Sequence, residues 1–308
     1  MEALLSRVAR VGSASGLNVV AFSGGVDSSV VAAAVARVFP RSSLAVIGRS
    51  AALPAAQLQL ARDVAAVIRI PLHVAETAEG ALPGYLENRG MSCYHCKSEL
   101  YATLSAVVDA TRDRSVAALA ESPPVERGGG GRTVLFNGTN ADDTTDLTRV
   151  GLVAAREWRV ESPIVDLTKV EVRAMARAFA LPNHDVAASP CLRSRLAFGV
   201  EATADHLQRV EAAELRVRDA LRLVGLPLAA SDDLRVRALP QGRAAVEVGA
   251  HAASMRGGLG SAQSARWFDG IGGVREQLVA LGFCSVELRA FASGSVAATV
   301  DGEAGSSL

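Results

Sequence analysis

A glycine- and serine-rich turn, SGGVDSS at residues 23–29, constrains the fold of this chain more than any other feature. A short apolar run at 17–22 ends at the turn, and small and apolar residues continue from 26 to 38. The first run predicts a buried strand and the second a helix, so the turn connects the end of a strand to the start of a helix. Backbone N–H groups and the helix N-terminus then favour an anion the size of pyrophosphate.

Strands and helices alternate beyond this turn. Further strands are predicted at 44–47, 72–75 and 133–136, and helices at 55–67, 95–109 and 169–179. The alternation predicts an α/β fold with a Rossmann-like parallel sheet covered on both faces. A smaller α+β domain is predicted from helices at 203–223 and 274–281 and strands at 234–238, 244–248 and 284–290.

We therefore expect two domains. Residues 1–185 form the α/β domain, which carries a polar insertion rich in proline and glycine at about 111–132. Residues 186–295 form the α+β domain, and a small, polar tail follows at 296–308. The stretch 183–199 lacks periodicity but contains a cysteine and two arginines, which predicts a functional loop.

Composition limits the classes of function. Lys plus Arg and Asp plus Glu both total 32 among 308 residues, so the chain lacks the net positive charge typical of nucleic-acid binders. No apolar stretch is long enough to span a bilayer, and the first residues lack a signal-peptide core. We expect a cytoplasmic protein without nucleic-acid or membrane partners.

Two residue types are informative because they are scarce. Four cysteines are too few for a disulfide framework, and Cys93 and Cys96 form a CxxC pair, which in a cytoplasmic protein indicates metal or redox chemistry. Among 32 basic residues only Lys97 and Lys169 are lysines. Either a compact point charge is needed at these positions, or codon bias has left two lysines without special meaning.

The turn at 23–29 differs from a Walker loop, because no lysine follows its second glycine. The lysine that would bind the γ-phosphate is therefore missing. Chemistry at the α-phosphate of a nucleotide, with pyrophosphate as the leaving group, is the expectation, and an ordinary glycine turn is the alternative.

The turn resembles the pyrophosphatase loop of the PP-loop ATP pyrophosphatases. Further segments resemble the sulfur transferase family LarE, in family order from about residue 17 to 295. They are CYHCK at 93–97, GTNADD at 138–143, SP at 162–163, LTK at 167–169, SPCLRSR at 189–195, RVR at 235–237 and the closing stretch 282–295. The combination of SPCLxSR with CYxCK is far more specific than the turn alone.

This resemblance implies an ATP-dependent sulfurtransferase. Members of the family adenylylate the carboxylates of pyridinium-3,5-biscarboxylic acid mononucleotide and replace oxygen by sulfur, toward the nickel-pincer nucleotide of lactate racemase. A carboxylate is a poor acceptor until its oxygen belongs to a good leaving group, and an acyl-adenylate supplies AMP as that group. The implied partners are this small molecule and sulfide or another sulfur donor. A homo-oligomer is also implied, with the α+β domain serving substrate binding and oligomerisation.

The resemblance also assigns residues. The implied ATP-binding residues are Ser23, Gly24, Gly25, Asp27, Ser28, Ser29, Gly138, Thr139 and Asn140. Asp27 and Asp143 are the implied Mg²⁺ ligands, and for Asp143 the alternative is a solvated acidic turn formed with Asp142 and Asp146. The implied substrate-binding residues are Arg193, Arg195, Arg235 and Arg237, whose guanidinium groups match phosphate and carboxylate, and Glu211, which matches a family acid. The implied catalytic residues are Cys191, Cys93, Cys96 and Lys97.

The cysteines determine the sulfur source. Cys93, Cys96 and Cys191 resemble the family type that holds a 4Fe-4S cluster on three thiolates, which leaves one iron to carry a labile sulfide. A zinc site that adds His95, independent buried thiols, a persulfide, or a sacrificed Cys191 are the alternatives. At the level of function, a tRNA thiolation enzyme of the same superfamily and a non-catalytic nucleotide-binding module are the alternatives.

Overall fold

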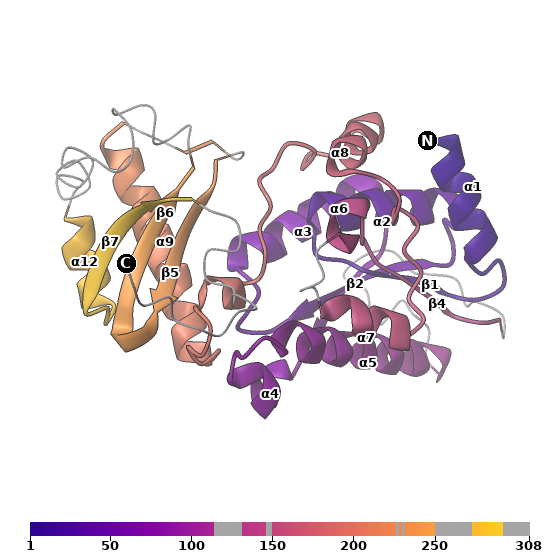
Figure 1. Cartoon of the computed structure of the whole chain (residues 1–308). Helices are drawn as coiled ribbons and strands as arrows, with labels where there is room; N and C mark the ends of the chain where they lie inside the picture. The colour runs from indigo at the N-terminus through magenta and orange to yellow at the C-terminus, as the bar shows by residue number, and fades with distance from the viewer. Residues whose placement is uncertain (114–130, 146–149, 226–227, 230–231, 250–272, 292–308) are drawn as a thin grey trace. The chain divides into compact units, whose positions relative to one another are not determined.

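The computed structural model describes residues 1–113, 131–145, 150–225, 228–229, 232–249 and 273–291. The chain divides into one unit of Met1–Glu79 with Cys93–Ser189, and a second of Gly80–Ser92 with Pro190–Leu308 (Figure 1). The sequence-based boundary at 185 left residues 80–92 in the first domain. They group with the second unit because Leu86 and Asn88 hydrogen-bond to main-chain groups of residues 196–202.

The first unit contains a four-stranded parallel sheet in the order β3-β2-β1-β4. Its strands are β1 Asn18–Ala21, β2 Ser43–Arg49, β3 Leu72–Glu76 and β4 Val134–Phe136. Strand β1 pairs with both of its neighbours, and Val19 of β1 lies opposite Leu44 of β2 and Leu135 of β4. The predicted α/β fold with a parallel sheet is confirmed.

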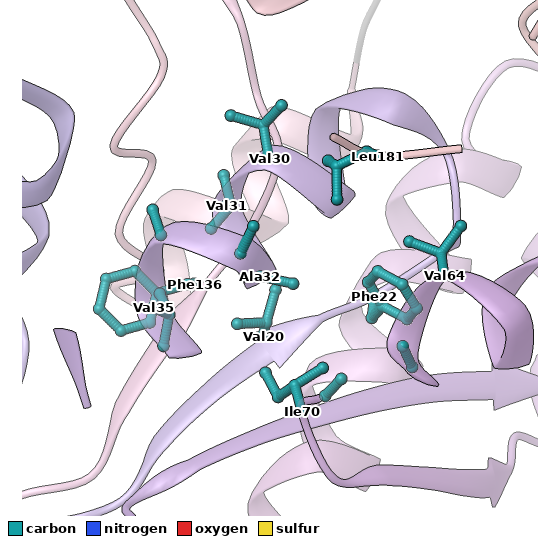
Figure 2. Packing of buried hydrophobic residues seen from close by; sticks show 14 of the residues in the cluster. Val20, Phe22, Val30, Val31, Ala32, Val35, Val64, Ile70, Phe136 and Leu181 are labelled. Atoms are coloured by element: carbon teal, nitrogen blue, oxygen red, sulfur yellow. The ribbon is translucent and has the colours of Figure 1, made fainter. Parts of the chain in front are cut away.

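Helices cover both faces of this sheet (Figure 1). They are α1 Glu2–Val11, α2 Val26–Val38, α3 Ala55–Ile68, α5 Ser92–Asp113, α7 Gly151–Glu157 and α8 Lys169–Ala178, and the short helix α6 Ala141–Thr144 follows β4 without a buried residue. Alternate strand residues point to opposite faces, so Val20 and Phe22 pack with α1, α2, α3 and α8, whereas Val19 and Ala21 pack with α5 and α7. Figure 2 shows part of the core that contains Val20 and Phe22. Each large apolar side chain buried there contributes about 1.5–3 kcal/mol, which fixes α2 against β1.

The strand order positions the site. Strands β2 and β3 lie on one side of β1, whereas β4 lies on the other. Where the order reverses, helices diverge and leave a crevice beyond the carboxyl ends of the strands. The turn at 23–29 follows β1, and the GTNADD segment at 138–143 follows β4. Both segments therefore lie at the same edge of the sheet.

The amino-terminal helix α1 is attached to the first unit by an ion pair. Arg7 donates two hydrogen bonds to the Asp166 carboxylate, Nη2 to Oδ2 at 2.7 Å and Nη1 to Oδ1, and a third to the carbonyl oxygen of Pro163 at 2.9 Å. The hydrogen bond from Arg7 lowers the pKa of Asp166 below its ordinary value. The Arg7 side chain is 30% exposed and the Asp166 side chain 54%, so we estimate at most about 1 kcal/mol for the pair.

We expect Asp166→Asn to lower the free energy of unfolding at neutral pH by about 1 kcal/mol or less. Because the folded-state pKa is lowered, the wild-type advantage is present above the ordinary pKa of Asp166 and lost as the pH falls through its lowered value. Urea unfolding of both proteins at neutral and strongly acidic pH measures this difference. A gap that persists at acidic pH would contradict the ion-pair explanation.

The second unit contains a three-stranded mixed sheet in the order β5-β6-β7. Its strands are β5 Leu234–Leu239, β6 Arg243–Val248 and β7 Ser285–Ala290, and its helices are α4 Pro83–Leu86, η3 Leu192–Arg195, α9 Ala204–Leu223, η4 Pro240–Gly242 and α12 Val274–Ala280. Strands β5 and β6 are antiparallel, whereas β6 and β7 are parallel. The second, small sheet agrees with the α+β domain predicted from the sequence.

Some elements differ from the sequence-based predictions. Helix α5 extends beyond the predicted 95–109 at both ends, and α7 was not predicted because seven residues give little periodic signal. Most of the predicted insertion, residues 114–130, and the predicted tail at 296–308 lie outside the described residues. Within the described part of the chain, no helix is both long enough and apolar enough to cross a bilayer.

Candidate functional site

The turn at 23–29 is held in shape by its own serines. The hydroxyls of Ser28 and Ser29 donate to the carbonyl oxygen of Gly25 at 3.1 and 2.8 Å, and Ser28 Oγ accepts from Ser23 N at 3.2 Å. Both of these serines are buried, whereas Ser23 is exposed. Ser28 and Ser29 therefore shape the loop. The exposed side of the turn presents Ser23, and the first N–H groups of α2 lack intrahelical partners.

Two buried amides outside the motif brace this turn. Gln57 Nε2 of α3 donates to the carbonyl oxygen of Ser23 at 2.6 Å. Asn183 Nδ2 donates to the carbonyl oxygen of Gly24 at 2.8 Å and to Ser29 Oγ at 2.9 Å. The other amide atom, Asn183 Oδ1, is buried without a hydrogen-bond partner among the described residues. Sequence reasoning missed both amides, and the only available signal was that Asn183 starts the aperiodic stretch 183–199.

Backbone packing explains two glycines. Gly24 has a φ of 70°, a conformation that favours glycine, and a Cβ there would lie 2.7 Å from Ala61 Cα. A Cβ on Gly138 would lie 2.6 Å from Ser28 N. The segment after β4 therefore packs directly on the first turn of α2.

Asn140 hydrogen-bonds to both of the aspartates that were predicted to bind Mg²⁺, Asp27 and Asp143. Its Oδ1 accepts from Asp143 N at 3.1 Å, and its N donates to Asp143 Oδ2 at 3.1 Å, which forms a capping box on α6. Its Nδ2 donates to Asp27 Oδ1 at 3.0 Å. The structure thus brings Asp27 together with Asn140 and Asp143, although Asp27 and Asn140 are 113 positions apart in the sequence.

Thr139, also a predicted ATP-binding residue, belongs to a turn around Asn137. The side-chain oxygen of buried Asn137 accepts from Thr139 N at 3.1 Å and from Ser162 Oγ at 2.7 Å. Asn137 Nδ2 donates to the hydroxyl of Tyr101 at 3.3 Å. Asn137 was not predicted as a site residue, and its contacts anchor the loop that carries Thr139.

Lys169 enters the same cluster. Its Nζ lies 2.5 Å from Asp27 Oδ2, and its backbone N donates to Asp142 Oδ2 at 3.2 Å. Thr168 caps α8 in a capping box with Glu171, which fixes the start of the helix at Lys169. The scarcity of lysine marked this residue, but no role was assigned to it. Asp27 therefore contacts an amide on one oxygen and an ammonium on the other.

The CxxC pair lies at the start of α5, which begins at Ser92. Cys93 and Cys96 are both half-buried, and a spacing of three places them on one helix face. Lys97, which is exposed and four residues after Cys93, shares that face. The spacing places His95 off this face, and its ring packs edge-on against Tyr94 with 5.6 Å between centroids. Helix geometry therefore places the thiols of Cys93 and Cys96 and the ammonium of Lys97 on one face of α5, and His95 does not share that face.

In the second unit, hydrogen bonds fix the main chain around half-buried Cys191. Its carbonyl oxygen accepts from Ser194 Oγ at 2.8 Å and from Arg195 Nη1 at 3.2 Å. Arg195 is 2% exposed, donates to the carbonyl oxygen of Pro190, and forms a two-pronged ion pair with Glu214 of α9 at 3.0 and 3.3 Å. Arg195 therefore clamps the Cys191 loop to α9. Glu211, the predicted acid, lies one turn before Glu214, which sequence reasoning missed.

Two further predicted arginines lie on one face of β5. Buried Arg237 donates to Glu247 Oε2 at 2.8 Å and to the carbonyl oxygen of Ser194 at 2.9 Å. The guanidinium carbons of Arg235 and Arg237 lie 5.6 and 6.0 Å from the centroid of the Phe291 ring. Burial, and next the positive charge of Arg195, lowers the pKa of Arg235 to about 10. The remaining arginine, Arg193, donates to Asn88 Oδ1 at 3.0 Å.

The predicted cluster ligands belong to different units. Cys93 and Cys96 belong to the first unit and Cys191 to the second. Among the described residues, no three His, Cys, Asp or Glu side chains group as metal ligands. The three-cysteine site and the two-carboxylate Mg²⁺ site both stay predictions.

Comparison with known proteins identified two relatives. The uncharacterized protein slr1717 of Synechocystis sp. is 35% identical over 201 residues, which cover 65% of this chain and 68% of slr1717. The pyridinium-3,5-bisthiocarboxylic acid mononucleotide synthase of Lactiplantibacillus plantarum is 26% identical over 219 residues, which cover 68% of each chain. No protein-family model matches the chain.

Proposed function

Because the chain belongs to the protein family of slr1717 and is distantly related to a pyridinium-3,5-bisthiocarboxylic acid mononucleotide synthase, we propose that it is an ATP-dependent sulfurtransferase. The proposed substrate is pyridinium-3,5-biscarboxylic acid mononucleotide, and the products are its thiocarboxylate, AMP and pyrophosphate, toward a nickel-pincer nucleotide. The ATP step rests on one observation, the hydrogen bond from Asn140 to Asp27. It joins the loop after β4 to the turn after β1, where the strand order of the sheet reverses. We also expect a homo-oligomer, as the family resemblance implies.

ATP binds with its pyrophosphate portion in the turn at 23–29, where Ser23 and the N-terminus of α2 favour an anion. Mg²⁺ fits the neighbouring donors, because Asp27 and Asp143 are linked through Asn140 and Mg²⁺ prefers a few carboxylates with phosphate oxygens and water. Asp27 pairs with Lys169 in the free protein, so a Mg²⁺ ion held by Asp27 would take the place of that ammonium. Lys169 would then be available to neutralise charge on the phosphates.

The first step is adenylyl transfer. A substrate carboxylate oxygen forms a bond to the α-phosphorus of ATP, while the bond from that phosphorus to the bridging oxygen breaks. The bridging oxygen leaves with the electron pair as part of pyrophosphate. Such a transfer needs positioning and charge stabilisation more than covalent chemistry, and Lys169 and the first turn of α2 supply both.

The second step exchanges oxygen for sulfur. Hydrosulfide adds to the acyl carbon, the bond from that carbon to the AMP oxygen breaks, and AMP leaves with the electron pair. The thiol proton goes to water and a thiocarboxylate remains. Cys93 and Cys96 fit a role in holding the sulfur source together with Cys191, because they share one face of α5. A bound 4Fe-4S cluster would supply labile sulfide at these three thiolates.

We expect Arg235→Met to separate substrate binding from stability. Burial disfavours the charge of Arg235 in the folded protein, but its guanidinium also donates to the carbonyl oxygen of Leu234 at 2.7 Å and pairs with Asp233. These effects oppose each other, so we expect the free energy of unfolding to change by about 2 kcal/mol or less in either direction. The KM for the pyridinium substrate should rise, because a guanidinium fork for phosphate or carboxylate is lost. Urea unfolding and steady-state kinetics measure both, with exposed Arg243→Met as the control. A large loss of stability with an unchanged KM would assign Arg235 a structural role instead.

The proposed function is tested by supplying ATP, Mg²⁺ and the pyridinium dicarboxylate to the purified chain. We expect pyrophosphate and AMP to form only when the dicarboxylate is present. Pyrophosphate release triggered by tRNA and not by the dicarboxylate would instead identify a tRNA thiolation enzyme. Binding of ATP without any pyrophosphate release would identify a regulatory nucleotide-binding module.

A further inference from the structure

Two successive carbonyl groups of the turn at 23–29 are held by side-chain amides from other parts of the first unit. Gln57 Nε2 donates to the carbonyl oxygen of Ser23 at 2.6 Å, and Asn183 Nδ2 donates to that of Gly24 at 2.8 Å. Gln57 is 7% exposed and Asn183 is 1% exposed, so water does not compete strongly for these bonds. The orientation of two neighbouring peptide groups is therefore fixed from outside the turn.

Each of these bonds also sets the direction of an N–H group. Both peptide bonds are trans, and in a trans peptide the C=O of one residue and the N–H of the next point in opposite directions. The N–H of Gly24 therefore points away from Gln57, and the N–H of Gly25 points away from Asn183. Gly25 N donates to the hydroxyl of exposed Ser23 at 3.3 Å, and Gly24 N has no hydrogen-bond partner among the described residues. Both N–H groups can therefore donate to an anion.

The two glycines make this outside support necessary. The peptide group between Gly24 and Gly25 has no Cβ on either side, so it can turn over at little steric cost. A turned-over peptide would present the carbonyl oxygen of Gly24 to an anion in place of the N–H of Gly25. The hydroxyls of Ser28 and Ser29 do not prevent this, because both donate to the carbonyl oxygen of Gly25. Asn183 holds the carbonyl oxygen of Gly24 instead.

Asn183 is itself held in place from α8. Arg173 of that helix donates to the carbonyl oxygens of His184 at 2.5 Å and Val186 at 2.9 Å, and Val186 N donates to the carbonyl oxygen of Asn183 at 3.3 Å. Asn183 Oδ1 is buried without a partner among the residues that the structure describes, which disfavours asparagine for stability alone. The benefit of asparagine at this position therefore lies in its Nδ2 donors.

We propose that Gln57 and Asn183 are positioning residues that orient the turn at 23–29 for pyrophosphate. They hold the carbonyl oxygens of Ser23 and Gly24 away from the anion, so that the N–H groups of Gly24 and Gly25 donate to it. The inference rests on the proposed function, in which this turn takes the pyrophosphate portion of ATP. Neither amide is assigned a contact with the nucleotide.

The test measures the binding of inorganic pyrophosphate, in the presence of Mg²⁺, to the purified full-length chain by isothermal titration calorimetry. Asn183→Leu and Gln57→Met remove the amides and nearly keep the side-chain volumes. Asn18→Leu is the matched control. Asn18 is fully buried in the same unit, and its Nδ2 also donates to backbone carbonyl oxygens, those of Ser13 at 2.8 Å and Ser42 at 3.3 Å, but it lies at the opposite end of β1 from the turn.

We expect Asn183→Leu and Gln57→Met each to bind pyrophosphate about tenfold more weakly than the wild type, comparable to the loss of one hydrogen bond to a charged group. Asn18→Leu should keep the wild-type affinity even where urea unfolding shows a similar loss of stability. Gln57→Met carries the test if Asn183→Leu does not fold.

Three outcomes would contradict this inference. Wild-type affinity in a folded amide variant would overturn the positioning role of that amide and leave the proposed function standing. An equal loss of affinity in Asn18→Leu would show that any missing buried amide weakens binding, which would also overturn the inference. A wild-type chain that does not bind pyrophosphate would contradict the proposed function, and the inference with it.

Discussion

Cys191→Ser abolishes thiocarboxylate formation while pyrophosphate release continues: this is the largest effect that we expect from a single substitution. Serine has nearly the volume of cysteine, and the main chain around residue 191 is held by Ser194 and Arg195, so the loop should keep its shape. The adenylyl transfer is assigned to Asp27, Lys169 and the turn at 23–29, and it does not need this thiol. Sulfur delivery should fall about a thousandfold or more, as is typical when a group that acts in a catalytic unit is removed.

Two assays on one sample separate these steps. Pyrophosphate is measured by a coupled assay, and the thiocarboxylate by mass spectrometry of the nucleotide product. Cys284→Ser is the control, because Cys284 is exposed and lies outside the predicted sulfur site. Undiminished thiocarboxylate formation by Cys191→Ser would contradict the sulfur role of Cys191. Loss of pyrophosphate release together with sulfur transfer would show that the two steps are not separable as proposed.

Asp27→Asn should stop the reaction at the earlier step. The substitution keeps the shape of the side chain but removes the charge that pairs with Lys169 in the free protein and with Mg²⁺ in the proposed complex. We expect pyrophosphate release to fall by about two to three orders of magnitude, comparable to the loss of a preorganised electrostatic group. Asp27 and Lys169 are partly solvated, so the free energy of unfolding should change by about 1 kcal/mol or less.

The measurement is pyrophosphate release as a function of Mg²⁺ concentration. Asp166→Asn is the matched control, since it removes an ion-paired aspartate of the same unit whose partner is Arg7. The control should keep the wild-type Mg²⁺ dependence. Wild-type release by Asp27→Asn would show that Asp27 does not bind the metal.

The sequence was sufficient to predict the layered α/β fold and the place of the turn at 23–29. Alternation of strands and helices requires parallel pairing, and parallel pairing places the turn at 23–29 at the same edge as the segment 138–143. These inferences depend on local pattern and on general rules of chain connection. They do not depend on which side chains touch.

The contacts inside the site were beyond prediction because they join distant parts of the chain. Asp27 and Lys169 are 142 positions apart, and Asn183 and Gly24 are 159 apart. Helix α9 illustrates the same limit at close range. Its pattern shows which face is apolar, but it does not show whether Glu211 or Glu214 meets Arg195. Asn88 carried no periodic signal, because what distinguishes it is a left-handed backbone conformation and tertiary hydrogen bonds.

The most direct test of acyl-adenylate chemistry follows the oxygen that leaves the substrate. The pyridinium dicarboxylate is prepared with a heavy oxygen isotope in its carboxylates and incubated with the chain, ATP, Mg²⁺ and sulfide. Adenylylation followed by sulfur exchange predicts that the label appears in the phosphate of AMP, while the nucleotide product gains sulfur and loses one labelled oxygen. Label that is recovered in orthophosphate alongside ADP, or that stays entirely in the product, would contradict the proposed mechanism.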